Sequence, residues 1–185
     1  MPDCEPIRFN FDERPAADAA GYLLTLHGGT MNYMRLIKLL YVAERESLSR
    51  FGRPILGDRY VSMKHGPVLS HVYDLVMTDP PEGPWARHIQ RFRPHAVSLR
   101  AQPRLDSLSR ADLQILTEVA ELYQKFDQFH LRNMTHEEFE EWQDPGDTSR
   151  EIPAERILEV LGKSPEEIER VRQRTTEKQT LDGGA

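Results

Sequence analysis

The stretch that decides the fold is residues 31–76, MNYMRLIKLLYVAERESLSRFGRPILGDRYVSMKHGPVLSHVYDLV. Its first half predicts a helix over about 30–50, because apolar residues recur there at helical spacing between Met34 and Leu48. Phe51-Gly52-Arg53-Pro54 should end that helix, since a residue that precedes proline disfavours the α conformation.

A rigid turn follows at Lys64-His65-Gly66-Pro67-Val68. Gly66 permits a close backbone approach or an unusual dihedral angle. Pro67 fixes the next φ angle and suits a first helical turn, so we expect a helix from Pro67 to about Met77. The alternation within residues 58–64, just before the turn, favours extended structure. We expect the turn to be structural and not a direct ligand contact.

Outside this stretch most signals are helical. Helices are expected over about 15–26, 109–130, 136–142, 153–161 and 164–176, each marked by a capping residue or by apolar periodicity. Residues 85–100 are less regular, and their strand-like alternation around a proline permits a small hairpin. The sequence therefore predicts a mainly α fold, a single compact helical domain with at most a small β hairpin.

Three segments are expected along the chain. Residues 1–14 should be a flexible N-terminal segment, residues 15–163 the folded domain, and residues 164–185 a C-terminal surface helix with a disordered tail. The predicted core consists of apolar and aromatic side chains from the long helices and the central turn: Leu23, Leu24, Ile37, Leu40, Tyr41, Val68, Val72, Tyr73, Leu116, Val119, Tyr123, Phe126 and Trp142.

The amino-acid composition favours a globular domain over a membrane or secreted protein. The 185 residues are 38% hydrophobic and 29% charged, which is typical of a soluble globular domain. No apolar run approaches the roughly 18 residues needed to cross a bilayer, and the N-terminus lacks the pattern of a secretory signal. The single cysteine, Cys4, has no internal disulfide partner and fits a reducing compartment. We expect a cytoplasmic protein.

The charge is unevenly distributed. The formal net charge of −6 argues against general nucleic-acid binding. Residues 85–110 carry six Arg against one Asp, whereas residues 111–170 carry sixteen acidic residues against six basic ones. The ordinary interpretation is two solvated faces, and the sharper one is a surface for a partner of uneven charge. The candidate partner-binding residues are Arg87, Arg91, Arg93, Glu137 and Glu141.

Two groups of residues invite a catalytic interpretation. His136 and Glu140 have the i, i+4 spacing of a helical metal pair, although Glu140 stands where a zinc protease has its second histidine. A capping box begun by Thr135 explains the same acidic residues without a metal. His71 and Asp74 are spaced for an acid–base pair, but no nucleophile accompanies them. We therefore expect no catalytic, cofactor-binding or metal-binding site.

Three ordered motifs carry a family resemblance. They are Leu36-Ile37-Lys38-Leu39-Leu40-Tyr41, then His65-Gly66-Pro67-Val68 with Val72-Tyr73, and then residues 131–142 with Ile152-Pro153 and Ile157-Leu158 downstream. The set resembles the Panacea domain family, also described as SocA-like antitoxins or phage-associated GepA-like proteins. The sequence departs from the family at Glu140-Glu141, where a proline is expected more often. The residues that match the family motifs, as scaffold or as partner surface, are Lys38, Tyr41, His65, Gly66, Pro67, Val68, Tyr73, Thr135, His136 and Trp142.

The resemblance implies a bacterial or phage-linked antitoxin that neutralises a cognate toxin protein by direct contact. It further implies a proteolytic adaptor that delivers the toxin to a ClpXP-type protease, with no cofactor and no membrane partner. Two other classes remain open from the residues alone. One is a metal-dependent hydrolase using His136 and Glu140, and the other is a DNA-binding autoregulator using Arg87, Arg91 and Arg93.

Overall fold

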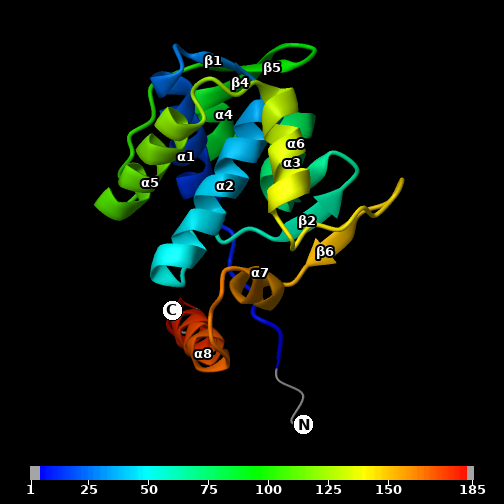
Figure 1. The fold of residues 1–185 in the computed structure, drawn as a ribbon. Coiled ribbons are helices and arrows are strands. Elements are labelled where there is room, and N and C mark those ends of the chain that lie inside the picture. The colour runs from blue at the N-terminus through cyan, green and yellow to red at the C-terminus, as the bar shows by residue number, and fades with distance from the viewer. Residues whose placement is uncertain (1–4, 183–185) are drawn as a thin grey trace.

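Helix α2 (Tyr33–Phe51) lies at the centre of the molecule in this computed structural model, which describes residues 5–182 (Figure 1). The Asn32 side chain caps its first turn by accepting hydrogen bonds from the backbone N–H groups of Met34 and Arg35. Gly52 ends the helix in the left-handed conformation at φ 60°. The predicted helix and its stop are therefore confirmed.

Three helices pack around α2: α1 (Glu13–Leu26), α5 (Arg110–Leu122) and α6 (Gln128–Glu138). Helix α5 begins with a complete capping box between Ser109 and Asp112. These four helices contribute most of the apolar side chains that form the core.

One antiparallel sheet covers the upper end of this helical group in Figure 1. Its strands are β1 (Thr30–Asn32), β4 (Ile89–Arg93) and β5 (Ala96–Leu99), in the order β1-β5-β4. The short helix α4 (Pro84–His88) leads into β4. The hairpin permitted by the sequence is therefore present, and it gains a third strand from a segment about 65 residues earlier.

A second antiparallel sheet holds the central turn. Its strands are β2 (Tyr60–Met63), β3 (Gly66–Leu69) and β6 (Arg150–Ile152), in the order β3-β2-β6. Helix α3 (Ser70–Thr78) follows β3 directly. The extended structure expected near residue 60 is confirmed.

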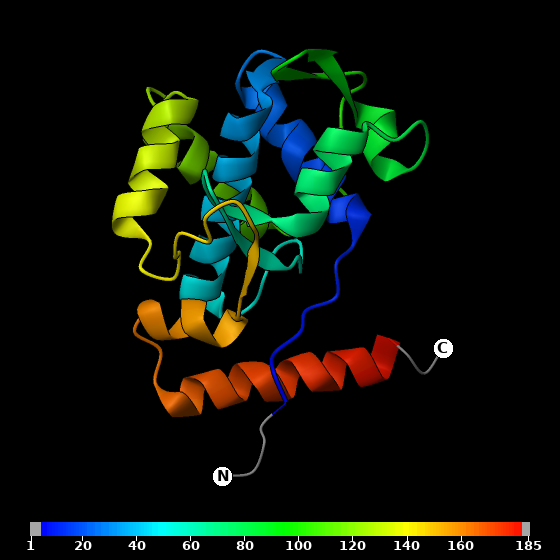
Figure 2. The same cartoon turned by 90° about the vertical axis from the view of Figure 1, so that its right-hand side faces the viewer.

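The C-terminal part lies at the opposite end from the first sheet. Helix α7 (Ala154–Val160) leads to the long α8 (Pro165–Asp182), and the N-terminal segment crosses α8 (Figure 2). The Arg172 guanidinium lies 3.1 Å from the Glu155 carboxylate and so ties α8 to α7. The flexible start and disordered tail expected from the sequence fall partly on residues 1–4 and 183–185, which lie outside the described residues.

The predicted fold class is wrong. The described residues are 54% helical and 13% strand, and they form two three-stranded antiparallel sheets. The fold is therefore mixed α/β and not mainly α with at most a small hairpin. The strands contain only three to five residues each, which is too short for an alternating pattern to stand out. Each sheet also depends on pairing with a distant segment.

The predicted helix start at Pro67 is also wrong. Residues 60–63 and 66–69 pair in antiparallel register, so Pro67 lies in strand β3 and the helix begins at Ser70. Because β3 is an edge strand, a proline without a backbone N–H is tolerated there.

Two further helix predictions are wrong in their bounds. The helix expected over 109–130 is two helices, since α5 ends at Leu122 and α6 begins at Gln128. The Asp127 side chain caps α6 by accepting from the backbone N–H groups of Phe129 and His130. The helix expected over 136–142 does not form, because α6 ends at Glu138.

Most of the predicted core is confirmed. The buried members are Leu23, Leu24, Ile37, Leu40, Tyr41, Val68, Val72, Leu116 and Val119. The partly buried members are Tyr73, Tyr123, Phe126 and Trp142.

Across residues 5–182, none of the helices has the length and apolar character that a bilayer crossing requires.

A buried carboxylate organises the loop between α2 and β2. Glu44 accepts hydrogen bonds from the backbone N–H groups of Ile55, Leu56 and Gly57 at 2.7 to 3.0 Å. Burial raises the pKa of Glu44 to about 7, although the three backbone donors oppose the shift. The loop is therefore held by an acid that titrates near neutral pH.

We predict that Glu44 makes stability fall with rising pH. Between pH 4.5 and pH 7 the folded state keeps a proton that the unfolded state has lost, so the free energy of unfolding decreases as pH rises. The free energy of unfolding of wild type minus that of Glu44→Gln should decrease by on the order of 3 kcal/mol across this window. Urea unfolding at both pH values measures it, with the exposed Glu137→Gln as control. Parallel pH profiles for wild type and Glu44→Gln would contradict the assignment.

Candidate functional site

The family-motif lysine is buried at the junction of α2 and the β2–β3 hairpin. Lys38 is 1% exposed, and its Nζ donates a hydrogen bond of 2.7 Å to the Pro67 carbonyl oxygen. Burial lowers the pKa of Lys38 to about 7, and the positive charge of Arg132 adds to the shift. The lysine thus supplies a donor to an edge-strand carbonyl, and ties the central helix to the sheet.

Gly66 is the close-approach residue of this junction. Its φ angle is +96°, and a Cβ atom there would lie 2.7 Å from the Lys38 Nζ and 2.8 Å from the Thr135 Oγ1. Real Cβ atoms do not approach other atoms so closely. Thr135 is itself fully buried, and its hydroxyl donates to the Arg132 carbonyl oxygen. The α2, β3 and α6 elements therefore meet at a point that only glycine fits.

The aromatic pair His136 and Trp142 closes the same junction from the other side. Their rings stack 4.0 Å apart with an interplanar angle of 6°. The Trp142 Nε1 donates to the Met63 carbonyl oxygen at 3.0 Å, which fixes the chain after α6 to strand β2. Burial lowers the pKa of His136, with a further contribution from Lys38. Its Nε2 is buried without a hydrogen-bond partner among the described residues.

A second buried polar group connects α2 with the segment after α6. Glu141 has a fully buried side chain that accepts from the Arg45 Nε at 2.8 Å and from the Tyr41 hydroxyl at 3.3 Å. Arg45 also covers the Phe139 ring at 4.2 Å. Burial raises the pKa of Tyr41, and the Glu141 carboxylate raises it further. Glu141 was a candidate for partner contact, but its carboxylate is buried and already paired with Arg45, so it offers no accessible charge at the surface.

The geometry also removes the basis of the metal hypothesis. His136 and Glu140 would share a helix face only if α6 continued, but the helix ends at Glu138 and Phe139 is extended at ψ 90°. Glu140 is exposed, whereas His136 stacks inward on Trp142. Within residues 5–182 no group of three or more His, Cys, Asp or Glu side chains is placed to hold a metal ion.

The spacing of His71 and Asp74 does not produce an acid–base pair either, because His71 pairs with Asp58. The His71 Nδ1 lies 2.7 Å from the Asp58 carboxylate, which is completely buried. Asp58 also accepts from the backbone N–H groups of His71 and Val72, so it caps the start of α3. No pattern in the sequence pointed to Asp58 or Glu44, because each caps a segment that lies ten or more residues away.

The remaining motif residues lie at or near the surface of the second sheet. His65 is exposed in the β2–β3 turn, whereas Val68 is buried. Val68 and the partly buried Tyr73 line a shallow cavity of about 340 Å³ on the outer side of this sheet. The His65 backbone contacts the His136 ring of the buried junction, whereas Val68 and Tyr73 line the cavity beside it.

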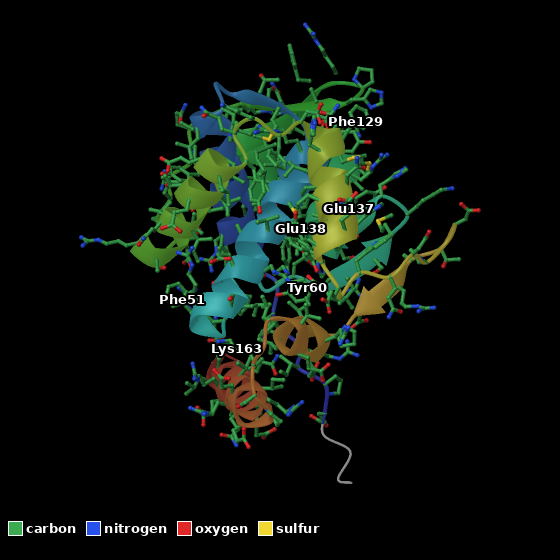
Figure 3. All side chains as sticks on the ribbon, in the orientation of Figure 1. Phe51, Tyr60, Phe129, Glu137, Glu138 and Lys163 are labelled. Atoms are coloured by element: carbon green, nitrogen blue, oxygen red, sulfur yellow. The ribbon has the colours of Figure 1, made fainter. Side chains whose placement is uncertain are left out.

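The candidate arginines differ in how firmly they are held. The Arg91 Nη2 donates to the Pro94 carbonyl oxygen at 2.6 Å, and its guanidinium lies over the Tyr33 ring. Arg87 and Arg93 are exposed, and Arg93 lies over the exposed Phe92. Glu137 is also exposed on α6 (Figure 3). Arg91 thus braces its hairpin, while the other three side chains are accessible.

The comparisons with known proteins agree with this arrangement of motifs. The family model described as "Antitoxin SocA-like, Panacea domain" matches residues 36–143, which is 108 of the 185 residues. The matched region contains the lysine, the hairpin and the aromatic pair of the buried junction. No curated protein and no solved structure gives a significant match to the chain.

We predict that Gly66→Ala destabilises the fold by about 2–4 kcal/mol, because it adds a clash to a positive φ angle. Gly28→Ala is the matched control, since Gly28 has φ +80° but no other atom within 4 Å of where the alanine methyl group would lie. Gly28→Ala should lower the free energy of unfolding by only about 1 kcal/mol. Chemical unfolding measures both variants. Equal losses would show that the junction tolerates a methyl group.

Proposed function

This chain belongs to the SocA-like Panacea antitoxin family, and on that premise we propose that it binds a cognate toxin protein and neutralises it by direct contact. The observation that carries the proposal is the family match over residues 36–143. The burial of Lys38, Gly66 and Thr135 supports it, because these motif residues join structural elements to one another and do not surround an opening. Such residues build a scaffold whose outer surface is free to contact another protein.

Family membership also favours a binding protein over an enzyme. We propose that the chain carries out no reaction of its own and acts in the cytoplasm of a bacterial cell. The alternative of a metal-dependent hydrolase has lost its geometric support, because His136 and Glu140 do not share a helix face. The exposed Arg87, Arg93 and Glu137 remain candidates for partner contact.

We predict that the product of the gene adjacent to this one is toxic when expressed alone and harmless when this chain is co-expressed. Growth after induction measures both states, and affinity purification of the tagged chain should recover the second protein in a fixed ratio. A version of this gene with an early stop codon is the control, since it keeps the transcript and removes the protein. A harmless neighbour, or a toxic one that never co-purifies, would contradict the proposal.

We further propose that α8 serves as a second surface, through which a ClpXP-type protease receives the bound toxin. Helix α8 lies outside the matched region and at one end of the molecule (Figure 1). It buries only Ile168 and Val171, and most of its other side chains face solvent. The Gln179 side chain donates to the Arg8 carbonyl oxygen, so the last turns of α8 are held to the N-terminal segment by polar contacts. An exposed and lightly held helix suits a weak, transient contact.

We predict that deleting residues 177–185 lengthens the lifetime of the toxin in cells without weakening its binding. Pulse-chase measurement of toxin half-life tests this, with binding followed by co-purification. Gln179→Ala in the full-length chain is the control, because it removes the contact with the N-terminal segment and keeps the tail. Unchanged degradation after the deletion would exclude the tail from the mechanism.

A further inference from the structure

A groove of about 500 Å³ lies between α2 and α5, open to solvent along the outside of the two helices. Its floor is apolar, since Val42 and Val119 are only 7% and 4% exposed. Its edge carries Leu122, which is 71% exposed. Figure 1 shows the two helices side by side, and the salt bridge from Arg50 to Glu118 connects them. The groove thus offers an apolar floor with a large exposed leucine beside it.

Tyr123 adds a polar anchor to the same groove. Its ring is half-buried and packs edge-on against Phe126 at a centroid distance of 5.3 Å. Among the described residues its hydroxyl group has no hydrogen-bond partner. Tyrosine is one of the residue types that dominate binding energy at protein interfaces. A partner that enters the groove therefore finds both apolar area and a free hydroxyl.

The rim of the groove is acidic. Glu46, Glu118 and Glu121 line it, and Arg50 is the one cation that lines it within the described residues. Arg50 is already held between two of these carboxylates, at 2.6 Å from Glu46 and 2.7 Å from Glu118. The three carboxylates and the one guanidinium therefore leave a net charge of −2 along the groove.

A fourth carboxylate adds to the negative field. The pKa of Tyr123 is raised by burial and by the negative charges of Glu138 and Glu46. Figure 3 shows Glu138 on the side of α6 that faces α2. The positive charge of Arg45 opposes these two carboxylates at Tyr123, so the preference for a cationic partner rests on the net negative charge of the groove lining.

We propose that this groove is where the toxin docks, through an amphipathic helix that places apolar side chains on Leu122 and Lys or Arg side chains along the acidic rim. The proposal rests on the function proposed above, and it names the surface and the chemistry of the partner. None of the groove residues belongs to the buried junction.

A helix fits this site better than the other possible occupants. Side chains of two adjacent helices form ridges and grooves into which a third helix packs, and helix-in-groove binding is a recurring mode of recognition. A strand would need an open sheet edge, which the groove does not provide. A second copy of this chain would bring the same acidic rim against itself in a twofold dimer, and like charges repel.

Leu122→Lys tests the apolar contact, and Leu181→Lys is its matched control because Leu181 is 78% exposed on α8. The probe is the toxin encoded by the adjacent gene, purified as an inactive variant, and its affinity is measured by calorimetry or surface plasmon resonance. Leu122→Lys should weaken binding at least tenfold, in the range of an interface hot spot, while Leu181→Lys changes it less than about twofold. Both leucines are exposed, so melting curves should match that of wild type.

Glu121→Lys tests the charge, with Glu177→Lys on α8 as the matched control. Neither glutamate side chain makes an ion pair in the described residues. Glu121→Lys should slow association and flatten its dependence on salt, whereas Glu177→Lys should change both much less. This second pair keeps the proposal falsifiable if a leucine variant folds poorly.

The outcomes separate the two proposals. If wild type binds the toxin and the groove variants bind as well as their controls, the docking site is elsewhere and only the groove proposal fails. If wild type does not bind the toxin, the proposed function fails and the groove proposal fails with it. If wild type is a dimer in sedimentation analysis and Leu122→Lys is a monomer, the occupant is a second copy and the toxin proposal for this groove is overturned.

Discussion

The hydrogen bond from the buried Lys38 amine to the Pro67 carbonyl oxygen is the contact on which the fold depends. An edge strand leaves carbonyl groups without a strand partner, and a buried carbonyl without a donor is costly. Lys38 provides the donor from the central helix, at the cost of placing an amine in an apolar interior. Burial lowers its pKa towards neutrality and so reduces that cost. Gly66, which has no side chain, lets helix α6 close over the same point.

The positions of most helices could be predicted from the sequence because their signals are local, although the break between α5 and α6 was missed. The cap of α5 by Ser109 and Asp112 lies within four residues, and so does the left-handed stop of α2 at Gly52. The sheets could not be predicted in the same way. Strand β1 pairs with β5, and β2 pairs with β6, across about 65 to 90 residues. A strand as short as β1 has no periodicity of its own, so its pairing is decided by tertiary packing.

The sequence identified the residues of the site but not their burial or their hydrogen-bond partners. Motif matching indicated Lys38, His136 and Trp142, and the structure brings all three together. Charge counting, however, treated Glu141 as a surface residue. Its burial depends on Arg45, which lies 96 positions earlier in the chain. A buried ion pair of this kind is a property of the folded pair, because neither charge alone would be stable in the interior.

The buried residues of the junction hold the domain together, whereas exposed residues such as Leu122 are the ones proposed to contact a partner. A substitution at Gly66 or Lys38 changes a residue that is packed on all sides. It therefore lowers the stability of the whole domain and affects every part of its surface indirectly. A change at Leu122 alters a side chain that projects largely into solvent, so it acts on one surface and leaves the interior as it was. The acidic groove lies between α2 and α5, so it shares helix α2 with the junction but uses other residues of that helix. On the proposed function, such a scaffold can keep its buried junction while the residues of the outer groove change to fit a different toxin.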